Sequence, residues 1–304
     1  MYFQRELKAL KRANRFRQRY IFDDKLKDLA SNDYLGLSSN KKILKKAINQ
    51  VSKYKSFAPK ASMIVNGYSK IHKDFEQLLC KVNNFDDAII VGSGFLANIS
   101  LIESMVRKND VLLIDEDYHA SGILASSLCQ GEVITFKHNN TDNLKFHLQN
   151  LTNDKNRIII AIEGIYSMQG DIASKEIATI ANNYNAILIV DEAHSSGVIG
   201  NNLLGWFDYF NIPVKPNHIK MGTLGKAYGS YGAYILASKE IISFLENRAK
   251  PIIYSTAPSI IDTAIGYQSL KYILANKDKF KKKIQKRQNI VKDILGIKVN
   301  GLII

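Results

Sequence analysis

Short runs of apolar, mostly β-branched residues recur along the middle of this chain, and each ends at a polar residue or at glycine. The runs are Ala88-Ile89-Ile90-Val91, Val111-Leu112-Leu113-Ile114, Ile158-Ile159-Ile160-Ala161-Ile162 and Ala186-Ile187-Leu188-Ile189-Val190. Segments with helical spacing of apolar residues alternate with them. Continuous apolar runs are typical of strands buried on both faces, as in parallel sheets covered by helices. The sequence therefore predicts an α/β fold with a mostly parallel central sheet in a large domain.

The residues that follow these runs carry side chains suited to chemistry. The first run leads into Gly92-Ser93-Gly94, and the later runs end at Asp115, Glu163 and Asp191. In open α/β sheets, ligands bind outside the carboxyl ends of the strands. We therefore expect a ligand site at this edge of the sheet.

The composition is that of a soluble globular protein, with 46% hydrophobic and 23% charged residues in 304. No apolar run reaches the roughly 20 residues that span a bilayer. The segment from Met1 to Glu6 has no apolar core of a secretory signal. Cys80 and Cys129 are too few for a disulfide framework. We expect a cytoplasmic protein with no membrane partner.

Basic residues outnumber acidic ones, which gives a formal net charge of +14. Such an excess can mark nucleic-acid binding. Here the lysines are spread along the chain, and the densest run, Lys277 to Lys292, has Phe280 and Ile284 among its charges. That spacing predicts an amphipathic helix with a solvated face, so we expect no nucleic-acid partner. The positive surface would attract an acidic partner.

A lysine among glycines lies downstream of the last apolar run, in the segment Gly222-Thr223-Leu224-Gly225-Lys226-Ala227-Tyr228-Gly229. The strand-end segment Asp191-Glu192-Ala193-His194 precedes it. Glycines allow close approach of the backbone to a ligand, and Thr223 offers a hydroxyl to a phosphate. In pyridoxal phosphate enzymes a lysine bonds covalently to the cofactor aldehyde, and a carboxylate keeps the pyridine nitrogen protonated. We predict these roles for Lys226 and Asp191, with His194 near the phenolic oxygen.

Other candidates for the cofactor site also follow predicted strands. Ser93-Gly94-Phe95 opens a helix, and a helix N-terminus is a ready phosphate site. His119 could stack on the pyridine ring, and Ser167 could hydrogen-bond a cofactor or substrate oxygen.

Rival ligands fit the sequence poorly. The Gly-x-Gly-x-x-Gly motif of dinucleotide-binding enzymes is incomplete here, because Ala97 stands where the third glycine is required. The box Asp191-Glu192-Ala193-His194 also occurs in helicases, but the phosphate loop that they need upstream is absent from the sequence. No His-Glu-x-x-His occurs among the six histidines, so we expect no catalytic zinc.

Several ordered blocks of this sequence resemble the α-oxoamine synthases, fold-type-I pyridoxal phosphate enzymes that condense an amino acid with an acyl thioester and release carbon dioxide. The blocks are Ser31-Asn32-Asp33-Tyr34-Leu35-Gly36-Leu37, Asn66-Gly67-Tyr68-Ser69-x-x-His72, Gly92-Ser93-Gly94-Phe95-x-x-Asn98, Glu163-Gly164-x-x-Ser167-Met168-x-Gly170-Asp171, the Asp191 box and Gly222-Thr223-x-Gly225-Lys226. The resemblance covers residues from about 5 to about 260 and implies pyridoxal 5′-phosphate as cofactor.

The resemblance implies a role for each matching residue. Catalytic roles fall to Lys226, His119, Asp191 and His194. Cofactor contacts fall to Ser93, Gly94, Phe95, His119, Ser167, Asp191, His194, Thr223 and Lys226. Arg17 and Asn32 match positions that line the substrate site. Ser255 and Thr256 match a segment that reaches the phosphate in a neighbouring subunit, which implies a homodimer with shared active sites.

Within the family, the Ser31–Leu37 block together with Tyr254-Ser255-Thr256 is most similar to members that join L-alanine to a pimeloyl thioester in biotin biosynthesis. The thioester donor is pimeloyl-CoA or the pimeloyl acyl-carrier protein. A member that uses glycine, such as 2-amino-3-ketobutyrate CoA ligase (glycine C-acetyltransferase), remains an alternative.

Two departures from the family bear on activity. No arginine for the substrate carboxylate follows Arg287, and Ser62 is followed by Met63 where relatives often carry arginine. A cofactor-binding remnant with little activity is therefore a further alternative. We expect an N-terminal arm over residues 1–40, a large cofactor-binding domain over 41–245, and the start of an incomplete C-terminal α+β domain over 246–304.

Overall fold

Two compact units make up the chain, Met1–Ser31 and Asn32–Ile304. The computed structural model describes residues 2–23, 25–152 and 155–304, so Met1 of the predicted arm lies outside the described residues. The first unit contains helix α1 (Gln4–Arg12). The predicted domain boundaries near residues 40 and 245 remain predictions.

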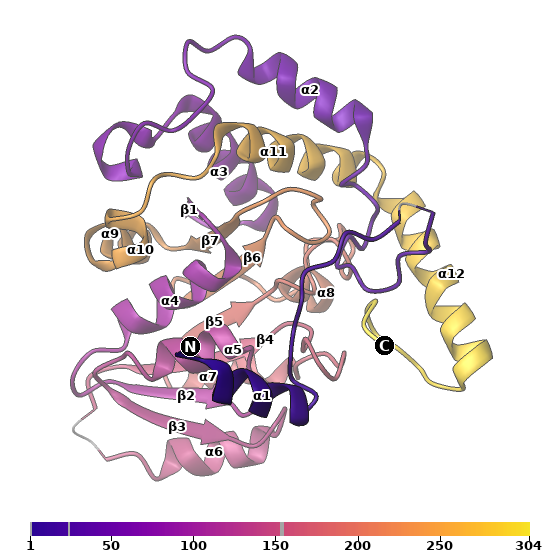
Figure 1. Ribbon diagram of the computed structural model, residues 1–304. Helices are drawn as coiled ribbons and strands as arrows, with labels where there is room; N and C mark the ends of the chain where they lie inside the picture. Colours follow the sequence, from indigo (N-terminus) through magenta and orange to yellow (C-terminus); the bar gives the residue numbers. More distant parts are fainter. Residues whose placement is uncertain (1, 24, 153–154) are drawn as a thin grey trace. The chain divides into compact units, whose positions relative to one another are not determined.

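A seven-stranded sheet forms the centre of the second unit, in the order β1-β7-β6-β5-β4-β2-β3 (Figure 1). The strands are β1 (Asp87–Val91), β2 (Val111–Asp115), β3 (Glu132–Phe136), β4 (Ile158–Glu163), β5 (Ile187–Asp191), β6 (His218–Thr223) and β7 (Ala233–Ala237). Strands β6, β5, β4, β2 and β3 run parallel, while β7 is antiparallel to both β6 and β1. The predicted mostly parallel sheet is confirmed.

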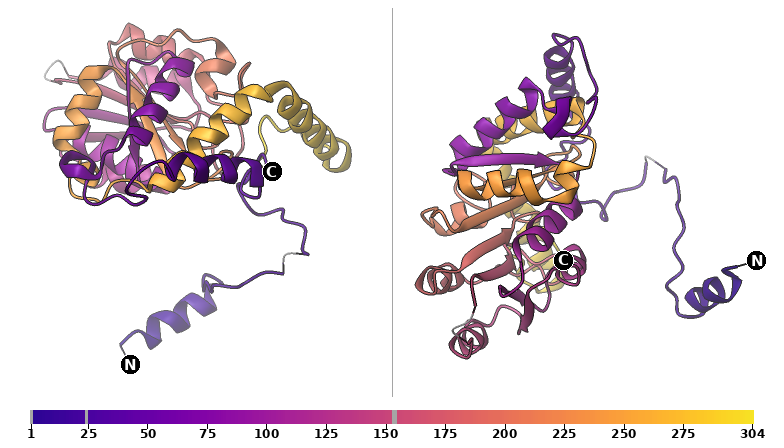
Figure 2. Two further views of the ribbon diagram at one scale, coloured as in Figure 1. Left: turned by 90° about the horizontal axis from the view of Figure 1, so that it is seen from above. Right: turned by 90° about the vertical axis from the view of Figure 1, so that its left-hand side faces the viewer.

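Helices cover both faces of this sheet (Figure 2). One face packs against α4 (Gly94–Met105), α9 (Lys239–Arg248) and α10 (Lys250–Ile253), and α5 (Ala120–Ser126) packs on α4. The opposite face packs against α3 (Lys70–Asn83), α6 (Thr141–Gln149), α7 (Glu176–Asn183) and α8 (Trp206–Phe210). Along β5, Leu188 and Val190 enter one core and Ile189 enters the other, as the two-residue period of a strand requires.

The remaining helical segments lie outside these two layers. They are α2 (Lys41–Val51), the short η1 (Met63–Gly67), α11 (Ile260–Ala275) and α12 (Lys277–Leu295). Helix α11 packs on α2 and α3. Helix α12 buries Phe280 and Ile284 and leaves most of its lysines in solvent, which confirms the predicted amphipathic helix. Among the described residues, no helix is both long and apolar enough to span a membrane.

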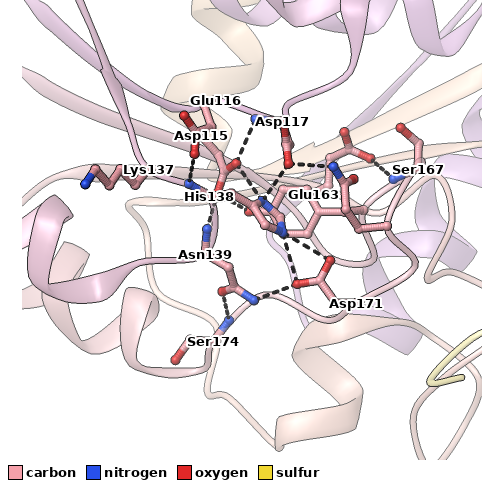
Figure 3. A network of polar contacts seen from close by, with 12 residues as sticks. Asp115, Glu116, Asp117, Lys137, His138, Asn139, Glu163, Ser167, Asp171 and Ser174 are labelled. Atoms are coloured by element: carbon pink, nitrogen blue, oxygen red, sulfur yellow. Dashed lines mark hydrogen bonds and ion pairs between the residues drawn. The ribbon is translucent and has the colours of Figure 1, made fainter. Parts of the chain in front are cut away.

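A network around His138 ties together the loops that follow β2, β3 and β4 (Figure 3). The ring nitrogen Nδ1 of His138 lies 3.0 Å from Asp115 Oδ1, and Nε2 lies 3.2 Å from Asp171. Tyr166 donates its hydroxyl to Asp115 Oδ2 at 2.7 Å, and Asn139 Nδ2 donates to Asp171 at 2.9 Å. These contacts fix the loops that carry His119 and Ser167.

The charge state of His138 follows from its partners. Burial alone would lower the pKa of His138, but the hydrogen bonds and negative charges of Asp115 and Asp171 outweigh it and raise that pKa. A histidine whose pKa rises on folding stabilises the fold fully below its unfolded pKa. That contribution is lost as the pH rises through the folded pKa.

We therefore expect His138→Ala to lower the free energy of unfolding by about 2 kcal/mol at about pH 6, where charge-assisted hydrogen bonds are lost. The loss should be smaller at about pH 9, where His138 is neutral in both states. Urea unfolding of wild type and variant at the two pH values measures this loss in the free energy of unfolding. His147→Ala, on α6 outside this network, is the control. If His138→Ala lowered the free energy of unfolding equally at both pH values, the positive charge assigned to His138 would be contradicted.

Candidate active site

A cavity of about 190 Å³ opens at the carboxyl ends of the strands. It is lined by residues that end or follow β1, β2, β4, β5 and β6: Gly94, Phe95, Asn98, His119, Ser121, Glu163, Asp191, Ala193, His194, Met221, Thr223 and Lys226. The structure thus brings together most of the cofactor residues predicted from the sequence, at the edge of the sheet where a ligand site was expected.

Lys226 lies in the turn between β6 and β7. Leu224 and Gly232 close this turn through an N–H to carbonyl bond of 2.8 Å. Gly229 has a φ of +60°, and a Cβ there would lie 2.4 Å from the Ser38 nitrogen, so this position requires glycine. Burial lowers the pKa of Lys226, while the charges of Asp191 and Glu163 oppose that shift. The amine is therefore easier to deprotonate than an exposed lysine.

Asp191 is the last residue of β5 and is only 4% exposed. Its Oδ1 accepts the Ala193 N–H at 2.9 Å, and its Oδ2 accepts from Asn98 Nδ2 at 2.9 Å. Asn98, on α4, also donates to Ser121 Oγ at 2.8 Å. A buried carboxylate is costly unless it is hydrogen-bonded. These contacts hold Asp191 in one orientation, with its charge facing the cavity.

His119 caps α5, and its ring lines the cavity. Its Nδ1 lies 2.7 Å from Ser121 Oγ and accepts the Ser121 N–H at 3.2 Å. Because Nδ1 is an acceptor, a neutral ring carries its proton on Nε2. The chain of contacts from Asp191 through Asn98 and Ser121 to His119 joins two predicted site residues, one at the end of β5 and one at the start of α5.

His194 is held between two side chains. Its Nε2 lies 2.6 Å from Lys226 Nζ, and its Nδ1 lies 2.6 Å from the Tyr34 hydroxyl. The Tyr34 hydroxyl also lies 3.1 Å from Asn32 Oδ1, so Tyr34 joins His194 to Asn32. Burial, aided by the charge of Lys226, lowers the pKa of His194 to about 3. The ring is neutral.

Among the residues of this site that were not chosen from the sequence are Tyr34, Asn98 and Glu163. Each stands in a block that carried the family resemblance, which was the available signal. Tyr34 holds His194, and burial raises the pKa of Tyr34 to about 12, so it remains a phenol. Glu163 ends β4 and is 1% exposed. Asn32, predicted for the substrate, contacts the site through Tyr34.

Other predicted residues are not among those that line the cavity. Ser93 caps α4, and its Oγ accepts the Leu96 N–H at 3.2 Å. The Ser167 N–H donates to Glu163 Oε2 at 2.9 Å. Ser255 and Thr256 follow α10 in a segment held by His72, whose Nε2 lies 2.9 Å from the Pro258 carbonyl. Arg17 belongs to the first unit, and its role remains a prediction.

The described residues fit pyridoxal phosphate. The cavity offers an amine of lowered pKa for an aldehyde, a fixed carboxylate for a basic ring nitrogen, and the N-terminus of α4 for a phosphate. One oxygen of Glu163, Oε1, is buried without a hydrogen-bond partner in the described part of the chain. A polar ligand would satisfy it.

The fold is that of an α/β enzyme, and a lysine lines the cavity at the carboxyl ends of its strands. The family model for aminotransferase class I and II matches residues 24–302, and the chain belongs to that family.

Named relatives narrow the family further. The chain is 46% identical over 297 residues to the 8-amino-7-oxononanoate synthase of Helicobacter pylori strain ATCC 700392 / 26695, covering 97% of this chain and 79% of that protein. It is 34% identical to the synthase of the same name from Thermoanaerobacter pseudethanolicus, covering 93% of this chain and 74% of that one. The predicted membership of the α-oxoamine synthases is confirmed.

Solved structures agree with this placement. The 8-amino-7-oxononanoate synthase from Francisella tularensis superposes with a TM-score of 0.73 at 29% identity, over 92% of this chain and 79% of that one. A serine palmitoyltransferase from Sphingomonas wittichii gives a TM-score of 0.84 at 23% identity, over 96% of this chain and 77% of that one. The second likeness concerns the fold alone. The predicted fold-type-I architecture is confirmed.

The lowered pKa of Lys226 can be measured in the cofactor-free protein. We expect reductive methylation of Lys226 to reach half its maximal rate at a pH below the ordinary lysine pKa of about 10.4. Asp191→Asn should move this midpoint further down, because it removes a charge that raises the pKa of the amine. Mass spectrometry of the labelled peptide measures the rate.

Glu240→Gln makes the same change of charge on exposed α9 and serves as the control. A Lys226 midpoint in the ordinary lysine range, or one that ignores Asp191→Asn, would contradict the site described above.

Proposed function

We propose that this chain catalyses the decarboxylative condensation of L-alanine with a pimeloyl thioester, with pyridoxal 5′-phosphate as cofactor. The products are 8-amino-7-oxononanoate, carbon dioxide and the free thiol. A carbon–carbon bond forms at the α-carbon of alanine, while the thioester carbon–sulfur bond and the bond to the alanine carboxylate break. The observation that carries this proposal is the Lys226 amine beside buried Asp191, in a chain 46% identical to a synthase of that name.

When bound, pyridoxal phosphate supplies a covalent attachment for the amino acid and a ring that withdraws electrons from its α-carbon. The protein's part is to hold and move protons around it. Lys226 would take the α-proton, since burial lowers the pKa of its amine. Asp191 presents a fixed negative charge to the ring nitrogen, which keeps that nitrogen protonated.

The other predicted residues have supporting roles in this proposal. His119 would stack on the ring, while His194, which contacts Lys226, would lie beside the phenolic oxygen. The phosphate is held by Gly94, Phe95 and Thr223, with Ser93 fixing the start of α4 and Ser167 assisting. Arg17 and Asn32 would face the substrate.

A homodimer with shared active sites is part of the proposal, with Ser255 and Thr256 reaching the phosphate of the neighbouring subunit. Segments near residues 61 and 257 are joined by a hydrogen bond between the Ala257 N–H and the Ala61 carbonyl, at 3.0 Å. Phe57, Val65 and Tyr254 on these segments are 77%, 75% and 81% exposed. Large exposed apolar side chains on joined segments favour burial against another protein surface.

The remaining assignments also stay proposals. We assign the reaction to the cytoplasm, which agrees with free thiols at Cys80 and Cys129. The thioester is carried by CoA or by an acyl carrier protein, and either acidic carrier suits a chain of net charge +14. The proposal includes no nucleic-acid or membrane partner.

The test is thiol release by purified protein loaded with pyridoxal phosphate. We expect release with L-alanine and pimeloyl-CoA or pimeloyl acyl-carrier protein, and at least tenfold less with glycine and acetyl-CoA, since a site shaped for one acyl chain discriminates at about this level. Lys226→Ala should abolish release, and exposed Lys239→Ala should retain it. Preference for glycine would favour the 2-amino-3-ketobutyrate ligase, and no release with any pair would favour a cofactor-binding remnant.

A further inference from the structure

Helix α12 does more than present its lysines to solvent. Two of its basic side chains donate to the segment that joins His194 to α8. Lys277 Nζ donates to Asn202 Oδ1 at 2.6 Å, and Lys281 Nζ donates to the Asn201 carbonyl at 3.2 Å. The basic run therefore holds part of the chain that follows β5.

Arg287, further along α12, contacts a second segment that supports the site. Its Nη1 donates to the backbone carbonyl of Tyr34 at 2.6 Å, and the two residues lie 253 positions apart in the sequence. A hydrogen bond from an ionised donor is about twice as strong as a neutral one. Arg287 is exposed and is not among the residues that line the cavity, so its effect on the site passes through Tyr34.

Tyr34 in turn determines how the His194 ring is oriented. The Tyr34 hydroxyl lies 2.6 Å from Nδ1 of His194, and Nε2 of the same ring lies 2.6 Å from Lys226 Nζ. Because the two contacts use the two different ring nitrogens, Nε2 is the nitrogen that faces the lysine. This orientation is the same whichever nitrogen carries the proton.

The segment around Tyr34 is also closely packed against the turns that carry His194 and Lys226. A Cβ at Gly229 would lie 2.6 Å from the backbone carbon of Leu37, and a Cβ at Gly197 would lie 3.8 Å from Leu35 Cδ1. Tyr34 itself is 7% exposed. Close-packed interiors transmit small displacements, so a shift of the Tyr34 backbone would reach the His194 ring.

We propose that Arg287 is a positioning residue of the active site. By holding the Tyr34 carbonyl, it fixes the phenol that turns His194 toward Lys226. The assignment rests on the proposed function, since it takes His194 and Lys226 as residues of that reaction. It gives the basic helix α12 a part in the chemistry that its solvated face does not provide.

The first test observes His194 in the cofactor-free protein. Nitrogen-15 NMR of histidine-labelled protein reports the hydrogen bonding of each ring nitrogen, and His194→Gln identifies the His194 signals. We expect Tyr34→Phe and Arg287→Met to move the Nδ1 signal, because the first removes the partner of Nδ1 and the second releases that partner. Arg287→Lys keeps a cationic donor and should move the signal less.

Lys286→Met is the matched control, since Lys286 is exposed and precedes Arg287 on α12. It should leave the His194 signals at their wild-type positions. If Arg287→Met also leaves them there, in a protein with the wild-type circular dichroism, the proposal is overturned. Should Arg287→Met fail to fold, Arg287→Gln gives the same test with a shorter, neutral side chain of similar helix propensity.

The second test separates kcat from KM for thiol release with L-alanine and the pimeloyl thioester. We expect Arg287→Met to lower kcat about fivefold, the size of one lost hydrogen bond, and to leave both KM values within about twofold of wild type. A fall confined to KM, or an unchanged kcat, would overturn the positioning role. Moved His194 signals in variants of a protein that releases no thiol would support the contact and count against the proposed reaction alone.

Discussion

A single buried negative charge at the end of β5 is the constraint on which the site depends. Asp191 is almost fully enclosed, and a carboxylate in that position is stable only while donors surround it. Its partners come from α4 and from the turn after β5, so the start of α4 has to lie against the strand end. That same helix start is the place where a phosphate would bind, and one interaction therefore fixes the distance between two parts of a ligand site.

The loops around Asp191 are also fixed by contacts that lie outside the cavity. The His138 network joins the turns after β2, β3 and β4 through Asp115 and Asp171 (Figure 3). Inside the cavity, Asn98 joins Asp191 to Ser121 and so to His119. A ring at position 119 stacks usefully only when its loop is fixed to about half an ångström. Two independent sets of contacts supply that rigidity, one on each side of the loop.

The sequence predicted those parts of the fold whose cause is local. Strands β1, β2, β4 and β5 are continuous apolar runs, and each was expected. Strand β6 was not, because it contains His218 and Lys220, two buried polar residues. Their partners, Asn182 for His218 and Asn83 for Lys220, lie on α7 and α3, and no local pattern marks such distant pairs.

The site residues that were predicted lie in local sequence motifs, whereas those that were missed act through contacts between distant parts of the chain. Lys226, Asp191 and His194 stand in short motifs with recognisable spacing. Tyr34 acts on His194 across 160 positions of sequence, and Asn98 acts on Asp191 across 93. Glu163 was visible as a strand end, but its free oxygen and its pairing with Asp191 follow only from the packed structure.

Burial allows a lysine that is proposed to act as a base to lie in the same cavity as two carboxyls. Burial lowers the pKa of Lys226, and each ionised carboxylate nearby raises it again. If Glu163 and Asp191 were both charged, they would hold the proton on the amine more firmly than either alone. The ease with which Lys226 loses its proton therefore reflects a balance between its burial, which favours the free amine, and these two carboxyls, which oppose it.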